Sequence, residues 1–205
     1  MKNWKKILAV CLAVVFCTGV GLRIWAVNLN RNDGERIIYP MGETAAYEDD
    51  FFVNADDIRS DYEVQIVSAK VTPLEEYLKE FDTTPEEFWD GEEPLFSTVY
   101  EVEAKFRNNC PSEDDSNQHI DLVNTILVTG RDWYQVQEDL WLLVYPETTP
   151  NGFRLSADSE MVVRLPFAVL NHTGASTEYV RNKDTYLLIS MWPTEKLMQV
   201  IPEKS

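Results

Sequence analysis

Nucleophilic catalysis needs a cysteine or serine beside a base, and beyond its first 27 residues this chain offers little of that kind. That part holds one cysteine, Cys110, and two histidines, His119 and His172, in different segments. The acidic run 113–115 after Cys110 is the opposite of the cationic surroundings that activate a catalytic thiol. No serine stands in a Gly-x-Ser-x-Gly elbow. We expect no nucleophilic active site; Cys110 is interpreted as a turn residue, with an intermolecular disulfide as the alternative.

Three acidic runs, 48–50, 56–57 and 113–115, supply the oxygen ligands that calcium prefers. None of them has the Asp-x-Asp-x-Asp-Gly spacing that directs several ligands at one ion. We therefore interpret the runs as solvated charge, with a weak structural calcium ion where loops converge as the alternative. Two carboxylates that meet only in the folded protein, as in glycosidases, also stay open as an alternative.

Aromatic side chains are the remaining candidates for recognition. Asp132, Trp133 and Tyr134 follow a glycine in what we interpret as a loop, and aromatic residues on loops can stack on sugars or anchor a protein partner. Trp141 and Trp192 lie on or beside predicted strands, and Trp141 is predicted to fill the core. The candidate contacts with a ligand or partner are therefore Asp132, Trp133 and Tyr134.

Alternating apolar residues predict that strands make up most of the chain beyond residue 35. In residues 62–72, for example, Tyr62, Val64 and Ile66 share one face and polar residues take the other. Pro166 places its strand at an edge or a bulge. This density of strands, without crossover helices, predicts an antiparallel β-sandwich over 36–205. The remaining predicted strands are 96–106, 119–129, 139–145, 160–170, 185–191 and 196–201, with an edge strand or irregular segment at 36–53.

Residues 73–91 break this period of two. A second helix start follows the first, because Thr84 can cap, Pro85 suits the first helical position and Glu87 completes a capping box. We expect two short helices that cover an open end or face of the sandwich. The apolar face of the first helix is formed by Leu74, Tyr77, Leu78 and Phe81.

The first 27 residues decide in which compartment the rest of the chain works. Lysines at 2, 5 and 6 precede an apolar run that continues to Val27 and is interrupted only by Arg23. About 20 helical residues span roughly 30 Å, so residues 7–27 are long enough to cross a bilayer. The positive-inside rule leaves residues 1–6 in the cytoplasm and the rest outside. We predict a transmembrane signal-anchor at 7–27 and a linker at 28–35; a cleaved signal peptide, giving a secreted domain, and a lipoprotein are the alternatives.

Net charge limits the possible partners, and cysteine content indicates the class of protein. Beyond residue 27 there are 35 acidic and 18 − 4 = 14 basic residues, a balance of −21. Nucleic acid and anionic lipid surfaces would be repelled, and we interpret the acidic surface mainly as a source of solubility. The single cysteine beyond the apolar segment excludes a disulfide within the domain, which favours a bacterial envelope protein.

Short motifs suggest a family for most of the chain. They are Met41-Gly-Glu43 with the acidic patch after it, Tyr62–Val71, Thr84–Phe88, Gly130–Tyr134, Leu165–Val169 and Leu188–Lys196. Together they resemble the DUF5028 family of uncharacterised single-pass proteins from gut Firmicutes. The resemblance implies an exported immunoglobulin-like domain behind an anchor, and it carries over no catalytic residue. Asp184-Thr-Tyr186 is also similar to the tyrosine corner of immunoglobulin-like folds.

These observations predict a membrane-anchored, extracytoplasmic binding module of the bacterial cell envelope. We expect it to be non-catalytic and to need no cofactor or metal. The expected partner is an envelope protein, such as a transporter or sensor, or a wall glycan held by exposed aromatic residues. A permanent accessory subunit of a membrane transporter or sensor complex is the competing hypothesis.

Overall fold

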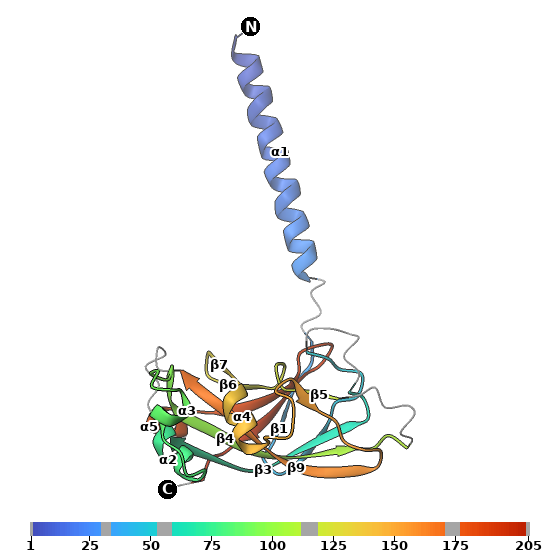
Figure 1. Cartoon of the computed structure of the whole chain (residues 1–205). Coiled ribbons are helices and arrows are strands. Elements are labelled where there is room, and N and C mark those ends of the chain that lie inside the picture. Colours follow the sequence, from blue (N-terminus) through green and yellow to red (C-terminus); the bar gives the residue numbers. More distant parts are fainter. Residues whose placement is uncertain (1, 30–33, 53–58, 112–118, 171–176, 204–205) are drawn as a thin grey trace. The chain divides into compact units, whose positions relative to one another are not determined.

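The computed structural model describes residues 2–29, 34–52, 59–111, 119–170 and 177–203 (Figure 1). The chain forms two compact units, Met1–Gly34 and Glu35–Ser205. The first is the helix α1 (Lys2–Leu29), in which Lys6–Ala26 has a mean hydropathy of 2.4. This confirms the predicted apolar helix, whose length and composition suit either a membrane anchor or a signal sequence. Residues 30–33 of the predicted linker lie outside the described residues.

The second unit is built mainly of strands. Its five-stranded sheet has the order β1-β11-β10-β6-β7, and its four-stranded sheet has the order β2-β3-β4-β9. The first sheet comprises β1 (Arg36–Tyr39), β11 (Glu195–Val200), β10 (Thr185–Ser190), β6 (Ile126–Thr129) and β7 (Asp132–Gln135). The second comprises β2 (Thr44–Ala46), β3 (Tyr62–Pro73), β4 (Phe96–Asn108) and β9 (Ser159–Leu170), while β5 (Ile120–Asp121) pairs with β8 (Gly152–Phe153).

The two larger sheets share one apolar core. Tyr62, Val64 and Ile66 of β3 are buried in it, as their alternation predicts, together with Leu187 of β10 and Met198 of β11. Neighbouring strands of these sheets run antiparallel except β1, which is parallel to β11. The prediction that the strand carrying the internal proline lies at an edge is confirmed, because β9 borders the four-stranded sheet.

Helices cover the other face of the four-stranded sheet. The prediction of two short helices within 73–91 is confirmed by α2 (Leu74–Lys79) and α3 (Pro85–Phe88). The helix α5 (Thr177–Arg181) is an addition, and its Val180 is buried in the core between the two sheets instead. A second apolar cluster joins α2 and α3 to the sheet. It contains Leu74, Tyr77, Leu78, Phe96, Val99, Leu140 and Ala168.

The prediction of a strand at 139–145 is wrong, because this segment forms the helix α4 (Glu138–Val144). Gln137 caps it by accepting a hydrogen bond from the backbone N–H of Leu140 at 2.7 Å. Leu140 and Trp141 are buried, so the prediction that Trp141 fills the core is confirmed. A run that is apolar on both faces lacks the strict period of two that indicates a half-buried strand. The Gln137 cap stabilises the start of a helix instead.

Three further expectations need correction. The predicted strand 119–129 is divided into β5 and β6 by a turn, in which the Val123 N–H donates to Asp121 Oδ1 at 2.8 Å. Residues 132–134 belong to the strand β7 and not to a loop. Tyr186 lies in a cluster with Leu188, on the face of β10 opposite the shared core, so it does not form a tyrosine corner.

Candidate functional site

The structure separates the three predicted contact residues. Because side chains alternate along a strand, Trp133 of β7 points away from Asp132 and Tyr134. Tyr134 is buried at 2% exposure, whereas Trp133 is 51% exposed and meets the Phe52 ring edge at 6.4 Å between centroids. Trp133 also lines a cavity of about 350 Å³ together with Gln135 and other residues. Of the three predicted residues, Trp133 presents the accessible ring.

The acidic run 48–50 is not simply solvated charge. Lys196 of β11 is 2% exposed, and its Nζ lies 2.7 Å from Asp50 Oδ2 and 2.6 Å from Glu48 Oε2. The interpretation as solvated charge is therefore wrong for Asp50, which is buried and neutralised by a lysine distant in sequence. The runs 56–57 and 113–115 lie outside the described residues. Elsewhere in the described part of the chain, no group of three histidine, cysteine or acidic residues could hold a metal ion.

Cys110 is shielded rather than exposed in a turn. Its exposure is 1%, and its backbone N–H donates to Asn108 Oδ1 at 3.0 Å. In this conformation the thiol is inaccessible to a second chain, which disfavours an intermolecular disulfide. His119 is exposed, and His172 lies outside the described residues.

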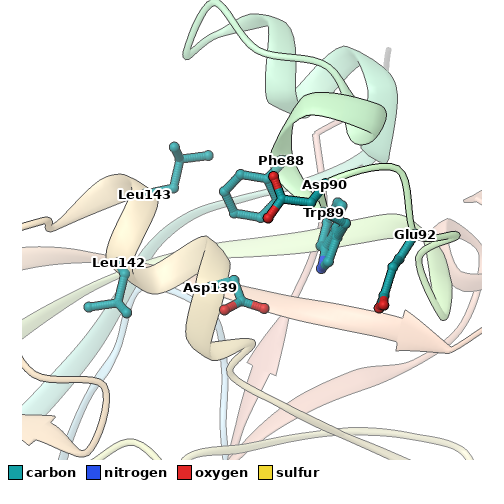
Figure 2. A pocket seen from close by; sticks show the side chains of 7 residues that line it. All are labelled: Phe88, Trp89, Asp90, Glu92, Asp139, Leu142 and Leu143. Carbon is teal, nitrogen blue, oxygen red and sulfur yellow. The ribbon is translucent and has the colours of Figure 1, made fainter.

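A groove of about 640 Å³ lies between α3 and α4 (Figure 2). This volume falls within the range of roughly 300–1,000 Å³ that is usual for ligand pockets. Leu143 and Asp139 on α4 lie opposite the end of α3 and the turn that follows it, while Leu142 lines the α4 side of the groove. The groove is lined by Phe88, Trp89, Asp90, Glu92, Asp139, Leu142 and Leu143.

The α3 wall is shaped by a cap at one end and a left-handed turn at the other. The predicted capping box is confirmed: Thr84 Oγ1 accepts from the Glu87 N–H at 3.3 Å, and Glu87 Oε2 accepts from the Thr84 N–H at 3.1 Å. Asp90 and Gly91 have φ values of 51° and 84°. Glycine adopts this region freely and aspartate tolerates it. The turn brings Asp90 and Glu92 to the border of the groove.

The α4 wall is held by Gln137 at its beginning. The Gln137 N–H donates to the Pro166 carbonyl of β9 at 2.8 Å, and its Nε2 donates to Asp139 Oδ2 at 3.0 Å. These bonds fix α4 along the border of the four-stranded sheet, with the carboxylate of Asp139 directed by its neighbour.

The groove floor is a continuation of the second apolar cluster. Phe88 and Trp89 pack edge to face at 4.5 Å between centroids, and Trp89 meets the buried Phe96 ring at 5.5 Å. Leu143 also packs against this cluster while remaining half-buried. Apolar side chains anchored in this way give a fixed surface rather than a mobile one.

The carboxylates of the groove have no cationic counterpart. Within the residues that the structure describes, no lysine or arginine forms an ion pair with Asp90, Glu92 or Asp139. The surrounding sequence adds to this charge: residues 73–97 contain nine acidic residues and one basic residue, a balance of −8 in a chain of net charge −17. The groove is therefore apolar at its floor and negative at its border.

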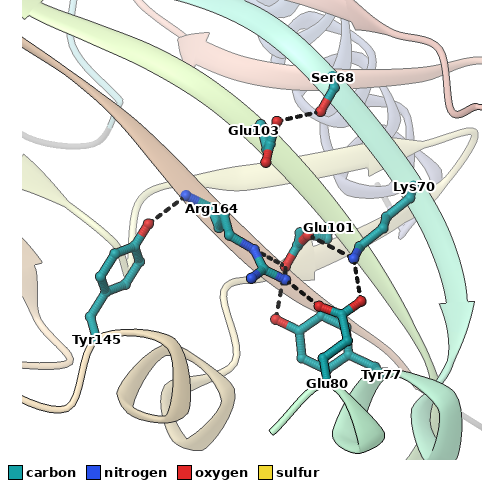
Figure 3. A network of polar contacts seen from close by, with 8 residues as sticks. All are labelled: Ser68, Lys70, Tyr77, Glu80, Glu101, Glu103, Tyr145 and Arg164. Atoms are coloured by element: carbon teal, nitrogen blue, oxygen red, sulfur yellow. Dashed lines mark hydrogen bonds and ion pairs between the residues drawn. The ribbon is translucent and has the colours of Figure 1, made fainter.

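A second set of carboxylates lies on the same side of the four-stranded sheet, in a network around Glu101 (Figure 3). Glu101 is 3% exposed, and its Oε2 accepts hydrogen bonds from Tyr77 Oη and Arg164 Nε, both at 2.9 Å. Lys70 Nζ lies 3.4 Å from Glu101 Oε1 and 2.6 Å from Glu80 Oε1. Arg164 also reaches Glu80, at 2.9 Å. Two cations thus match two carboxylates.

This pairing shifts the titration of its members. Burial lowers the pKa of Arg164, but the hydrogen bonds and charges of Glu101 and Glu80 outweigh burial and raise it overall. Burial likewise raises the pKa of Glu80, yet hydrogen bonds from Lys70 and Arg164 lower it by more. Burial and the adjacent Glu101 carboxylate raise the pKa of Tyr77 far above its ordinary value. Arg164 and Glu80 are therefore both charged at neutral pH.

The network also connects two helices to the sheet: α2, which precedes the α3 wall, and α4, which is the other wall. Tyr77 and Glu80 belong to α2 and its C-terminal cap, the element that leads into α3. The backbone N–H of Arg164 donates to the hydroxyl of Tyr145, the C-terminal cap of α4, at 2.7 Å. Arg164 is consequently bound to the cap of each helix, once by its side chain and once by its backbone (Figure 3).

A family model described as a domain of unknown function, DUF5028, matches residues 36–196. The chain belongs to the DUF5028 family. The match covers most of the chain, confirms the resemblance drawn from the short motifs, and includes the groove and the network of this DUF5028 domain. Comparisons with curated proteins and with solved structures gave no match.

Sequence reasoning missed the groove in this DUF5028 chain. Asp139 and Leu143 come from a segment whose pattern predicts a strand, so the sequence does not indicate that they approach Asp90. One available signal is the charge of residues 73–97, which contain nine acidic residues and one basic residue.

Proposed function

We propose that this chain is a membrane-anchored, extracytoplasmic binding module of the bacterial cell envelope, and that a partner protein binds in the groove between α3 and α4. The observation that carries the proposal is the combination of an apolar floor with carboxylates that lack a described cation. Surfaces with an anchored aromatic centre and a polar border are typical of protein interfaces.

The membrane placement of the module is part of this proposal. Residues 7–27 act as a single-pass anchor, with residues 1–6 in the cytoplasm and the domain outside. The lysines before the apolar segment support this orientation, because positive charges favour the cytoplasmic side. Cleavage of the segment would release the same domain as a secreted binder.

We further propose that the domain is an immunoglobulin-like sandwich. Two features support this assignment: β4 pairs with β9 in one sheet, while β6, β10 and β11 are adjacent in the other. The chain passes between the sheets after β4 and again after β9, as Greek-key connections require.

The proposal includes a non-catalytic role. Glu101 and Glu103 are two residues apart on the same face of β4, and paired carboxylates are the groups that glycosidases use for catalysis. However, Glu101 is occupied by Tyr77, Arg164 and Lys70, and Glu103 accepts from Ser68 Oγ at 2.6 Å. Carboxylates held in this way support structure rather than proton transfer to a substrate.

Site-specific photo-cross-linking tests the binding role. A benzophenone amino acid replaces Leu143 in the groove or, as a control, the exposed Val67 of β3, in living cells. We expect an adduct with one envelope protein, identified by mass spectrometry, from the Leu143 position alone. Identical adducts from both positions, or none from Leu143, would contradict the proposal. Co-purification of that protein in fixed 1:1 stoichiometry would identify a permanent accessory subunit rather than a transient binder.

A wall glycan bound at Trp133 is the second candidate function. The exposed ring lies beside a cavity of about 350 Å³ that also presents Gln135, Gln137 and Glu138, and sugars are held by a stacked ring together with planar polar groups. Binding to purified wall material should be lost on Trp133→Ala and kept on Trp192→Ala. Equal binding by all three proteins would remove this candidate.

A further inference from the structure

We propose that the segment bound in the groove is basic, with an apolar side chain flanked by lysine or arginine residues. This inference rests on the proposed function of the groove as a protein-binding site and specifies the chemistry of its partner. The occupant follows from three features of the described residues: local charge, the groove floor and the internal arrangement of Arg164.

Local charge selects the sign of the partner. The groove borders the segment 73–97, whose balance of −8 is nearly half of the chain's net charge of −17. Such a concentration of one sign creates a field that attracts cationic segments and repels anionic ones. Asp90 and Glu92 are exposed and form no ion pair within the described residues. Their negative charge can therefore act on molecules outside the domain.

The floor of the groove favours an apolar side chain in the bound segment. Phe88, Trp89, Leu142 and Leu143 offer half-buried apolar surface, so an acidic border alone does not describe the site. A leucine or aromatic side chain can cover this floor, while the aliphatic stem of a neighbouring lysine or arginine packs beside it and places its charge at the border. The face of Trp89 adds a cation–π partner.

The same protein already binds a cation with this set of groups. In the network, the Arg164 guanidinium lies between Glu80 and Glu101 and over the Phe81 ring, 5.7 Å from its centroid. The groove presents carboxylates beside aromatic rings in the same way but supplies no described cation of its own. A basic side chain from another molecule would neutralise the groove carboxylates, as Arg164 neutralises Glu80 and Glu101 in the network.

A peptide-binding measurement on the full chain in nanodiscs of zwitterionic lipid tests the proposal. The probe is a short fluorescent peptide of lysine, leucine and tryptophan, compared with the same peptide carrying glutamate in place of lysine. The groove variant is Asp90→Asn/Glu92→Gln/Asp139→Asn, in which asparagine retains the left-handed conformation at 90. Fluorescence anisotropy gives Kd for each pair.

The matched control removes three charges from the segment 73–97 but outside the groove. Glu75→Gln/Glu86→Gln/Glu93→Gln alters the lining of a separate cavity and changes the net charge by the same amount. We expect binding of the lysine peptide to weaken about tenfold in the groove variant, because exposed ion pairs with the three carboxylates would be lost. The control variant should bind within about twofold of the wild type, and the glutamate peptide should not bind.

Two results would overturn the proposal. Equal weakening in the groove and control variants would mean that diffuse charge, and not the groove, attracts the peptide. Failure of the lysine peptide to bind the wild-type protein would exclude a basic segment as the occupant. The proposed function fails independently, when the Leu143 cross-linker captures no envelope protein; an adduct without peptide binding would leave the function standing and reject the chemistry of the partner.

Discussion

The network around Glu101 and the groove between α3 and α4 lie on the same side of one sheet, and they treat charge in opposite ways. Both contain three carboxylates: Glu80, Glu101 and Glu103 in the network, and Asp90, Glu92 and Asp139 in the groove. Glu80 and Glu101 of the network are paired with Lys70 and Arg164, and Glu103 accepts a hydrogen bond from the Ser68 hydroxyl. Those of the groove have no described cation.

The difference follows from burial. A carboxylate as enclosed as Glu101 requires a compensating charge, because removing an ion from water costs several kcal/mol. Exposed Asp90 and Glu92 carry no such requirement, so the fold tolerates them without partners. The network therefore neutralises buried charge within the fold, whereas the groove carboxylates stay exposed, as our proposal of a bound partner requires.

The largest expected effect is the loss of the buried carboxylate in Glu101→Gln. Arg164 and Lys70 would lose their shared counter-charge, and the free energy of unfolding should fall by about 3 kcal/mol. Denaturant unfolding of the full chain in detergent measures this loss. Glu92→Gln in the groove is the matched control and should change stability by less than about 0.5 kcal/mol. Similar losses in both variants would erase the distinction between the two regions.

Acid should weaken the network in a defined direction. Because hydrogen bonds from Lys70 and Arg164 outweigh burial and lower the pKa of Glu80 in the folded protein, its stabilisation is complete above the ordinary glutamate pKa of about 4.3 and is lost as the pH falls through the lower folded value. In a series of measurements that starts at pH 6, the melting temperature should therefore begin to decrease once the pH is below about 4.3. Glu80→Gln should reduce the slope of this fall; an unchanged slope would show that Glu80 does not contribute to it.

A smaller effect is expected from the capping box that shapes the groove wall. Thr84→Ala removes the hydroxyl that accepts from the Glu87 N–H, and such a loss costs about 1 kcal/mol. Amide exchange at Glu87 and Phe88 should accelerate, and binding to the groove should weaken with it. Thr84→Ser retains the acceptor and should preserve both, so a loss in Thr84→Ser would point to a cause other than the cap.

The smallest effect on stability is expected from the groove variant itself. Asp90→Asn/Glu92→Gln/Asp139→Asn removes charges that no described cation matches, and its unfolding free energy should stay within about 0.5 kcal/mol of the wild type or rise slightly at low salt. Chemical denaturation at two ionic strengths checks this. A loss comparable to that of Glu101→Gln would place the groove carboxylates in the fold rather than in binding.

Local sequence patterns are sufficient to predict the helix α3, which forms one wall of the groove. Thr84, Pro85 and Glu87 stand within four residues, so the capping box could be read directly and is present in the structure. Long strands such as β3 and β4 were equally accessible, because their alternation extends over many residues.

The remaining contacts depend on residues distant in sequence. Lys196 pairs with Glu48 and Asp50 although 148 and 146 positions separate them, and no local pattern announces such a pair. The short helix α4 was hidden by a run that is apolar on both faces. The groove requires both α3 and α4, so an error in one helix was enough to conceal the site.

The most direct test of the groove as a binding site combines the cross-linker at Leu143 with the three groove substitutions. In the wild-type background, we expect an adduct with one envelope protein. In the background Asp90→Asn/Glu92→Gln/Asp139→Asn, the yield of this adduct should fall about tenfold while the amount of folded protein is unchanged. An adduct whose yield is the same in both backgrounds would contradict the claim that these carboxylates hold the partner.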